Sequence, residues 1–320
     1  MRKSCAILLL TFLFLFLVGQ EDAGAQSLRP YENLISTQDQ KQMLEQLADG
    51  MTEGRASGTP GKFLAEHYLI EQFREMGLKP LNWAYTQSFR HEDSIAIRNV
   101  VGLLPASVPS DEYIVIGAHY DHLGRLGHTV YPGADDNASG VTALLSLARM
   151  FCAMKADGAG PRKNLVFVAF DGKELGLAGS SWFVRHCPVP KGKIKAMVNM
   201  DMLGTDLVPP HSNREYLFAI GENTLPEAYQ GYLSYLCHRA AYKLDLDLTF
   251  YGSPKFSKMM YTTSDQHPFA RAGIPAVLFT SAFHQHTLKK TDTPAIIDYP
   301  LLRKRTLVIF NFINRLCADN

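Results

Sequence analysis

The chain has 320 residues, of which 46% are hydrophobic and 20% charged, and its formal net charge is +1. This balance excludes the basic footprint of a nucleic-acid-binding protein and a polybasic patch for anionic membranes. The length suits one large domain or two. Because no Pro-, Ser- or Gly-rich linker, charge block or internal repeat interrupts residues 26–320, we predict a single domain there.

The first 25 residues have the pattern of a secretory signal peptide. Residues 1–3 (Met-Arg-Lys) are positively charged, residues 5–18 form a short apolar run, and Ala23-Gly24-Ala25 offers a small-residue cleavage site. The run is shorter than the roughly 20 apolar residues that span a bilayer. We therefore predict a cleaved leader over 1–25, a secreted or periplasmic protein, and no stable membrane insertion after cleavage.

Helical and strand patterns alternate along the rest of the chain. Apolar residues at helical spacing predict helices over 37–51 and 62–77. Three strands are expected next, at 81–89, 97–104 and 112–119. Asp136 and Asn137 then supply capping side chains ahead of a further amphipathic helix.

The second half of the chain continues this alternation. The near-continuous apolar run at 164–170 (NLVFVAF) is typical of a strand covered by helices on both faces of a sheet. The remaining elements expected are a strand at 195–200, a hairpin-like insertion near 216–222, helices at 225–243 and 264–272, a strand at 275–280 and a helix at 299–317. The pattern predicts a three-layer α/β/α fold with a mixed, mainly parallel central sheet.

Four potential metal ligands stand where apolar runs stop. His119 closes the strand at 112–119, Asp136 precedes a helix, Glu174 follows the run at 164–170, and Asp201 follows the strand at 195–200. Ligands bind outside the carboxyl ends of the strands in open α/β sheets, so these side chains are expected to converge. Carboxylate and imidazole together suit zinc, and a bridging carboxylate would allow two metal ions.

The cysteines leave two interpretations open. Residues 26–320 contain an even number, which permits disulfides in an oxidising compartment without fixing their pairing. Buried free thiols on apolar helices are the alternative for Cys152 and Cys317. There is no Cys-x-x-Cys spacing, which argues against a cysteine metal site. The other two cysteines are Cys187 and Cys237.

A series of motifs resembles one family along nearly the whole of residues 26–320. In chain order they are GRASGTPG, FREMGLKP, GAHYDHLG, GADDNASG, FVAFDGKELGLAGS, VNMDMLG, SDQHPFARAGIPA and TDTPAIIDY. Their order and spacing resemble the secreted zinc aminopeptidases with a co-catalytic dinuclear site, which are relatives of glutamate carboxypeptidase and glutaminyl cyclase. The resemblance implies a zinc exopeptidase-like catalytic domain over 26–320, acting on peptides with a free N-terminus.

The resemblance also implies roles for individual residues. His119 and Asp201 would bind one zinc ion and Glu174 the other, with Asp136 bridging both, so up to two zinc ions are expected per chain. Asp121, two residues after His119, matches the acid that orients and polarises the metal-bound imidazole.

The fifth ligand is less well determined by the sequence. The family has a histidine four residues before the Asp of an Asp-Thr pair, but Leu288 stands four before Asp292 here. His286 is the nearest histidine and is our predicted ligand, because loops absorb insertions of this size. His284 is the second candidate, and a site with four protein ligands remains a further alternative.

Catalysis is where the chain departs most from the family. Two consecutive glutamates are the usual pattern, the first acting as general base, whereas this chain has Lys173-Glu174. A protonated lysine cannot accept a proton from water. Three hypotheses follow: Lys173 is a neutral base with a depressed pKa; Lys173 turns away and a carboxylate such as Asp171 or Asp265 substitutes; or peptidase activity is reduced.

These motifs predict an exported zinc-dependent exopeptidase that hydrolyses N-terminal peptide bonds with metal-activated water. One alternative is a glutaminyl cyclase-like acyltransferase, although GADDNASG looks more like the hydrolases. The other alternative, motivated by Lys173, is a catalytically impaired homologue that binds peptide or metal.

Overall fold

The computed structural model describes residues 27–92, 94–207 and 214–318. The predicted leader at 1–25 lies outside these residues and stays a prediction. Within the described ranges, no helix is both long enough and apolar enough to cross a membrane.

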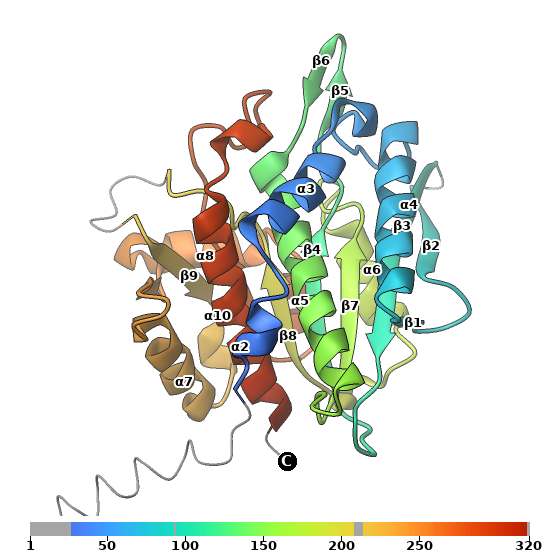
Figure 1. Cartoon of the computed structure of the whole chain (residues 1–320). Helices are drawn as coiled ribbons and strands as arrows, with labels where there is room; N and C mark the ends of the chain where they lie inside the picture. The colour runs from blue at the N-terminus through green and yellow to red at the C-terminus, as the bar shows by residue number, and fades with distance from the viewer. Residues whose placement is uncertain (1–26, 93, 208–213, 319–320) are drawn as a thin grey trace, which may run out of the picture.

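A nine-stranded mixed sheet forms the centre of the molecule (Figure 1). Its order is β1-β3-β7-β4-β8-β11-β9-β10, with β2 paired to β3. The central strands β7, β4, β8 and β11 run parallel, and antiparallel pairs flank them. The strands of the sheet are β1 (Lys79–Pro80), β2 (Thr86–His91), β3 (Ile95–Leu104), β4 (Tyr113–His119), β7 (Asn164–Phe170), β8 (Ile194–Met200), β9 (Tyr216–Ile220), β10 (Asp245–Asp247) and β11 (Ala276–Thr280).

Helices cover both faces of this sheet, which confirms the predicted α/β/α architecture (Figure 1). One face carries α3 (Thr37–Leu47), α4 (Pro60–Glu75), α5 (Gly140–Ala156) and α10 (Tyr299–Ala318), with α7 (Glu227–His238) packed on α10. The other face carries α6 (Ala178–His186) and α9 (Gln266–Arg271), with α8 (Pro254–Thr262) beside α9 and β9. The short helix α2 (Arg29–Glu32) contacts α5, and β5 (Gly124–Leu126) pairs with β6 (Thr129–Tyr131).

Side chains of β7 show how one apolar run supplies two cores. Leu165 and Phe167 belong to the core beneath α5 and α10. Val166 and Phe170 point the other way, into the core that contains Phe183 of α6. Successive strand residues face opposite sides of a sheet, so a strand covered on both faces is apolar at every position.

Two details of the predicted element order are wrong. The segment near 216–222 is not a hairpin insertion, because β9 joins the main sheet between β11 and β10. A short apolar run carries no information about its partner strand, which tertiary structure decides. Helix α8 was not predicted; it begins at Pro254 after Ser253, whose hydroxyl accepts the Phe256 N–H. It has nine residues, of which only Met260 is buried, so it is shorter than the window of roughly 11–18 residues over which helical periodicity is read.

The four cysteines in the described ranges, Cys152, Cys187, Cys237 and Cys317, are all free. Burial raises the pKa of the Cys152 and Cys317 thiols to about 12. The free-thiol interpretation therefore holds for both residues, with Cys317 buried and Cys152 partly buried, and neither is a reactive thiolate.

Candidate metal centre

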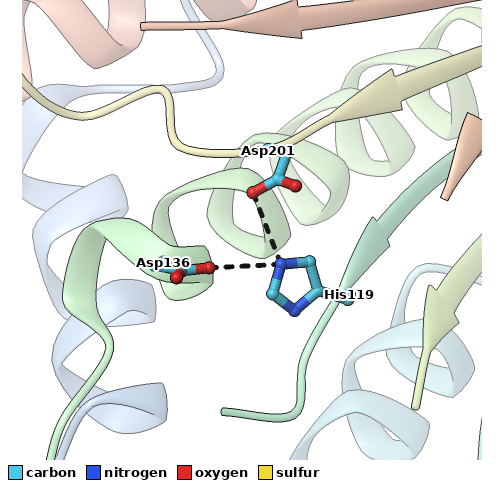
Figure 2. Close-up of side chains that lie close together, drawn as sticks. All are labelled: His119, Asp136 and Asp201. Atoms are coloured by element: carbon cyan, nitrogen blue, oxygen red, sulfur yellow. Dashed lines mark hydrogen bonds and ion pairs between the residues drawn. The ribbon is translucent and has the colours of Figure 1, made fainter. Parts of the chain in front are cut away.

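Three side chains from separate segments meet at the carboxyl ends of β4 and β8 (Figure 2). His119 ends β4, Asp201 follows β8, and Asp136 lies in the turn before α5. The Nε2 atom of His119 lies 3.3 Å from Asp136 Oδ1 and 3.4 Å from Asp201 Oδ1. All three residues are buried, and each offers a ligand atom within 4.8 Å of the others. An imidazole and two carboxylates in this arrangement fit a zinc ion.

Backbone geometry fixes the orientation of His119. Its Nδ1 lies 3.0 Å from the backbone carbonyl of Asp121, whereas the Asp121 carboxylate is 3.7 Å away. A proton on Nδ1 leaves the Nε2 lone pair facing Asp136 and Asp201. The family resemblance implies this orienting role for the Asp121 carboxylate, but the nearer contact is made by the backbone carbonyl of the same residue.

The Asp121 carboxylate instead holds the turn that carries the next two site residues. Its Oδ1 accepts the backbone N–H of Lys173 and its Oδ2 that of Glu174, both at 3.1 Å. Asp121 therefore positions the Lys173-Glu174 pair opposite His119.

A second carboxylate holds the turn that carries Asp136. The two oxygens of Asp292 accept the backbone N–H groups of Asp135 and Asp136, at 2.8 and 3.0 Å. The predicted capping role of Asp136 is wrong, because its side chain faces the cluster instead of the start of α5. Asn137 does cap, since its Oδ1 accepts the N–H of Gly140 at 3.0 Å.

Arg55 is a supporting residue that the sequence analysis missed. It is fully buried, and its guanidinium donates to the carbonyls of Pro132 and Gly133, immediately before the Asp136 turn, and to those of Leu47 and Tyr120. The only sequence signal was its place in the GRASGTPG motif, since nothing local reveals that a loop arginine turns inward.

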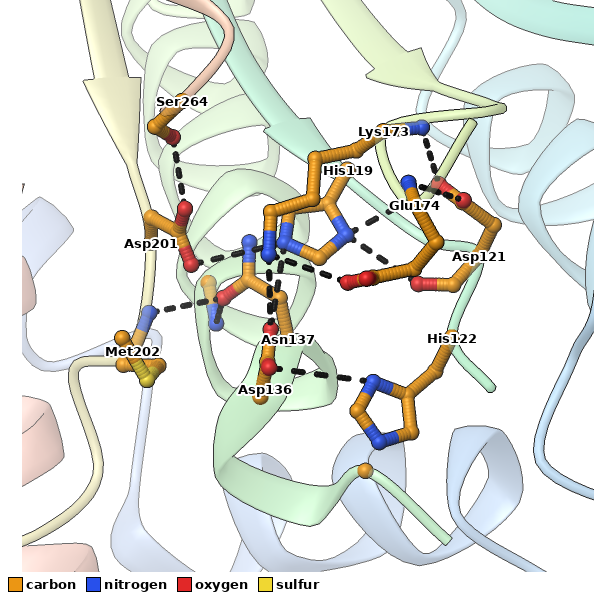
Figure 3. A network of polar contacts seen from close by, with 12 residues as sticks. His119, Asp121, His122, Asp136, Asn137, Lys173, Glu174, Asp201, Met202 and Ser264 are labelled. Atoms are coloured by element: carbon orange, nitrogen blue, oxygen red, sulfur yellow. Dashed lines mark hydrogen bonds and ion pairs between the residues drawn. The ribbon is translucent and has the colours of Figure 1, made fainter. Parts of the chain in front are cut away.

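Lys173 points into the cluster (Figure 3). Its Nζ lies 3.0 Å from Glu174 Oε1 and 3.4 Å from Asp136 Oδ1, and its side chain is only 12% exposed. Burial alone would lower the pKa of Lys173, but attraction to Asp136, Asp201 and Glu174 outweighs it and holds the pKa well above the ordinary value. The hypothesis that Lys173 turns away is therefore wrong, whereas the neutral lysine base stays a prediction, because bound metal ions would oppose the attraction of these carboxylates.

His122 is a second residue that the sequence analysis did not single out. Its ring is buried, and its Nδ1 lies 3.8 Å from Asp136 Oδ2 (Figure 3). Within the described part of the chain, neither ring nitrogen of His122 nor Asp136 Oδ2 has a hydrogen-bond partner. His122, Asp136 and Glu174 each offer a ligand atom within 4.8 Å of the others. The signal in the sequence was its place in GAHYDHLG, three residues after His119.

The two loop histidines make their described contacts away from the cluster. His284 is buried, with its Nε2 3.0 Å from Asp135 Oδ2, and its Nδ1 accepts the His286 N–H. His286 lies with its Nδ1 2.9 Å from Thr291 Oγ1 and its Nε2 against Gln285. The assignment of His286, or of His284, as the fifth ligand stays a prediction.

The two carboxylates considered as substitute bases are fully buried. The Asp171 Oδ2 atom forms a salt bridge with Lys62 Nζ at 2.9 Å, and its Oδ1 accepts a hydrogen bond from the Ser57 hydroxyl at 2.6 Å. Burial raises the pKa of Asp265 to about 7. Neither lines the cavity at the cluster, so neither is placed to take a proton from water there.

A cavity of about 270 Å³ opens over the cluster. Lys173 and the three acids form its polar wall. The other lining residues are mostly apolar: Met202, Met259, Met260, Thr263, Ser264, Phe283 and Leu288. Ser264 also donates to Asp201 Oδ2 at 2.5 Å, which fixes that carboxylate at the cavity edge.

The fold and the buried His-Asp-Asp cluster define an α/β/α protein with a candidate metal site at the carboxyl ends of its central strands. Residues 99–313 match the model of peptidase family M28, and the chain belongs to this family. The resemblance to the zinc aminopeptidases is thereby confirmed, and zinc is the metal that the family and the cluster support.

Individual relatives agree with this placement. The chain is 30% identical over 184 residues to Aminopeptidase YwaD of Bacillus subtilis strain 168, which covers 57% of this chain and 35% of that protein. It is 35% identical over 119 residues to transferrin receptor protein 2 of Homo sapiens, covering 36% of this chain and 14% of the receptor. The chain thus spans about a third or less of the length of these two relatives.

Solved structures confirm the fold. LapB from Legionella pneumophila superposes with a TM-score of 0.71 at 20% identity, covering 91% of this chain and 75% of LapB. Porphyromonas gingivalis glutaminyl cyclase superposes with a TM-score of 0.67 at 17% identity, covering 88% of this chain and 99% of the cyclase. The LapA aminopeptidase of Legionella pneumophila superposes with a TM-score of 0.70 at 20% identity, covering 91% of this chain and 75% of LapA. An aminopeptidase and a cyclase thus share this fold, so fold alone does not separate the two activities.

Proposed function

We propose that this chain is an exported zinc-dependent exopeptidase that removes N-terminal residues from peptides. The observation that carries the proposal is the meeting of His119, Asp136 and Asp201 at the foot of a cavity with an apolar wall. Membership of family M28 and similarity to an aminopeptidase support it. Export rests on the leader pattern of residues 1–25.

In this proposal His119, Asp136 and Asp201 hold the metal, with Glu174 and a loop histidine as further predicted ligands. Zinc held by these residues would supply a water of lowered pKa and a polarised scissile carbonyl. The chain supplies the geometry: the Asp121 carbonyl orients His119, Asp292 holds the Asp136 turn, and Ser264 holds Asp201. None of these contacts has to form during the reaction, which keeps the site preorganised.

The substrate we propose has an apolar N-terminal side chain. Three methionines and a phenylalanine line the cavity beside the acids, and methionine adapts its flexible thioether to ligands of different shape. These residues are Met202, Met259, Met260 and Phe283. The free α-amine would lie toward the acidic wall, where Glu174 is partly exposed.

Lys173 favours a second candidate function, a catalytically impaired homologue that binds peptide or metal. Its ammonium stands at the position where a general base is expected and is paired with two carboxylates. A general base contributes about 10²–10⁴-fold to a hydrolytic rate. The proposed exopeptidase is therefore slower than a relative with glutamate at this position, though metal-assisted hydrolysis does not require the base.

The test uses the purified protein without residues 1–25. Hydrolysis of a panel of aminoacyl-anilides and cyclisation of a glutaminyl-peptide are measured with zinc, with chelator, and after zinc is restored. The proposal expects zinc-dependent release of apolar residues. Cyclisation without hydrolysis would favour the acyltransferase, and peptide binding without turnover would favour the impaired homologue.

Asp136→Ala is the matched variant for this assay. Because Asp136 contacts both His119 and Lys173, its removal should abolish most zinc binding and all zinc-dependent turnover. Full retention of zinc in Asp136→Ala, measured by metal analysis after dialysis, would refute the proposed centre.

A further inference from the structure

We propose that a cavity between α6 and α9 is a binding site for a phosphate group, held by Arg185, Lys191 and Arg271. The ligand class is inorganic phosphate or a phosphate monoester. This cavity is separate from the metal cluster, because the two cavities have no lining residue in common. The inference does not rest on the proposed function, and it gives the chain a second kind of ligand.

Three cations from three separate elements line this cavity, which has a volume of about 420 Å³. Arg185 lies in the last turn of α6, Arg271 is the last residue of α9, and Lys191 begins the single turn Lys191–Lys193 before β8. The two helices pack against each other on one face of the sheet. No aspartate or glutamate is among the described residues that line the cavity, so positive charge dominates its wall.

These three cations are exposed and form no ion pair with any described residue. Lys191 differs in this from the other lysine of its own turn, because Lys193 pairs with Asp111. The exposed Arg74 of α4 is also paired, with Glu71. Like charges that gather without a counter-ion repel one another. A bound anion offsets this repulsion and is attracted to all three groups.

The chemistry of the three groups favours phosphate over a single carboxylate. A guanidinium presents parallel N–H groups that match the oxygens of a phosphate, and an ammonium adds a compact point charge. A phosphate monoester carries a charge of about −1.5 to −2 near pH 7 and has three strong acceptor oxygens, one for each cation. A carboxylate has a single charge and two oxygens. The Ser181 hydroxyl also lines the cavity and offers an uncharged donor.

His267 shows that this positive charge acts at the cavity wall. Burial lowers the pKa of His267, and the charge of Arg271 lowers it further. An anion beside Arg271 would offset this repulsion and raise the pKa of His267. Because His267 itself lines the cavity, its ring is a local reporter of binding.

Binding is measured by isothermal titration calorimetry on the protein without residues 1–25, after chelator has removed zinc so that phosphate cannot bind the metal. Inorganic phosphate is titrated at constant ionic strength. We expect saturable binding at one site with a millimolar dissociation constant. The double variant Arg185→Gln/Arg271→Gln should weaken binding about 4–25-fold, because each exposed charge pair contributes about 2–5-fold. Arg74→Gln removes an exposed arginine elsewhere and should leave the affinity unchanged.

A second measurement follows the imidazole signal of His267 by NMR, assigned by its loss in His267→Gln. Saturating phosphate should raise the pKa of His267 in the native protein, and this rise should shrink in Arg271→Gln. Lys191→Gln is a milder variant that should weaken phosphate binding about 2–5-fold if the double variant does not fold.

Two further ligands identify where the phosphate group comes from. Tighter binding of a phosphoserine peptide than of inorganic phosphate would place the group on a peptide, and weaker binding would place it on a free ion or a small ester. Succinate, a dicarboxylate, should bind more weakly than phosphate.

Three results would each overturn the inference: no saturation with phosphate, equal affinity in the native protein and the double variant, or tighter binding of succinate. The protein is free of metal in this assay. Such a failure would therefore leave the exopeptidase proposal standing, and an absence of peptidase activity would leave the phosphate site standing.

Discussion

Two buried lysines each lie between a pair of carboxylates, yet they have different consequences for this molecule. Lys62 of α4 is fully buried and lies 2.9 Å from Asp171 and 3.2 Å from Glu66. Lys173 lies 3.0 Å from Glu174 and 3.4 Å from Asp136. The pairing is chemically the same. The two pairs differ in the accessibility of their carboxylates. Asp171 is fully buried inside the fold, whereas Glu174 and Asp136 line a cavity.

This difference indicates that the Lys62 pairing stabilises the fold, whereas the Lys173 pairing is part of the candidate site. Asp171 follows β7, Glu66 belongs to α4, and the Arg98 backbone of β3 also donates to Asp171. Through Asp171, Lys62 thus links α4 to the end of β7 and to β3. Within the described residues, the Lys173 side chain pairs with Asp136 and Glu174 of the cluster, and a metal ion bound there would compete for the same carboxylates.

The largest effect is expected at Lys62. Lys62→Ala should lower the free energy of unfolding by about 3–5 kcal/mol, because removing one partner of a buried pair leaves the others uncompensated. Urea unfolding followed by circular dichroism measures this. Lys41→Ala removes an exposed i,i+4 pair with Glu45 and should change stability by at most about 0.5 kcal/mol. Equal effects in the two variants would contradict the structural role of Lys62.

Substitution of the second lysine, Lys173, should change peptidase activity. Lys173→Glu restores the family pattern and should raise zinc-dependent peptidase turnover by about 10–10³-fold, within the usual contribution of a general base. Initial rates on the best aminoacyl-anilide measure it. Lys191→Glu makes the same charge change at an exposed residue and should leave the rate as it was. A native rate unaffected by Lys173→Glu would show that Lys173 does not limit turnover.

Stability should separate the two lysines in a second way. Lys173→Met leaves three carboxylates facing one another, so the chelator-treated protein should lose about 1–3 kcal/mol, in the range of hydrogen bonds to charged groups. Zinc should restore most of this loss, whereas it should not rescue Lys62→Ala. Thermal unfolding with and without zinc makes the comparison. A zinc-independent loss in Lys173→Met would mean that the two lysines play the same part.

The smallest effect is expected at the residue that orients Lys173. Asp121→Ala frees the backbone N–H groups of Lys173 and Glu174, and it should weaken zinc binding by about 10–100-fold, as for other residues that support metal ligands. Competition with a fluorescent zinc chelator measures the affinity. An unchanged affinity would indicate that the turn keeps its shape without this carboxylate.

The sequence predicted which residues meet where parallel strands end. It did not predict the orientation of long side chains or the contacts made by loops. His119 ends one buried strand and Asp201 follows another, and the two strands run parallel in one sheet, so their meeting was predictable. The inward turn of Lys173 and Arg55 was not, because partners of long side chains are distant in sequence. The loop of His284 and His286 shows the same limit, since its contacts with Asp135 and Thr291 depend on how the loop folds.

Arg55 bears on where a minimal working fragment could begin. The family match starts at residue 99, yet this guanidinium, from well upstream, holds the carbonyls of Pro132 and Gly133 just ahead of Asp136. It also binds the carbonyl of Leu47 at the end of α3. A fragment limited to residues 99–313 would keep every predicted ligand. It would lose the Arg55 guanidinium, which donates to the carbonyls just before the Asp136 turn. The boundary of the family match at residue 99 and the boundary of a self-sufficient metal site therefore do not coincide in this chain.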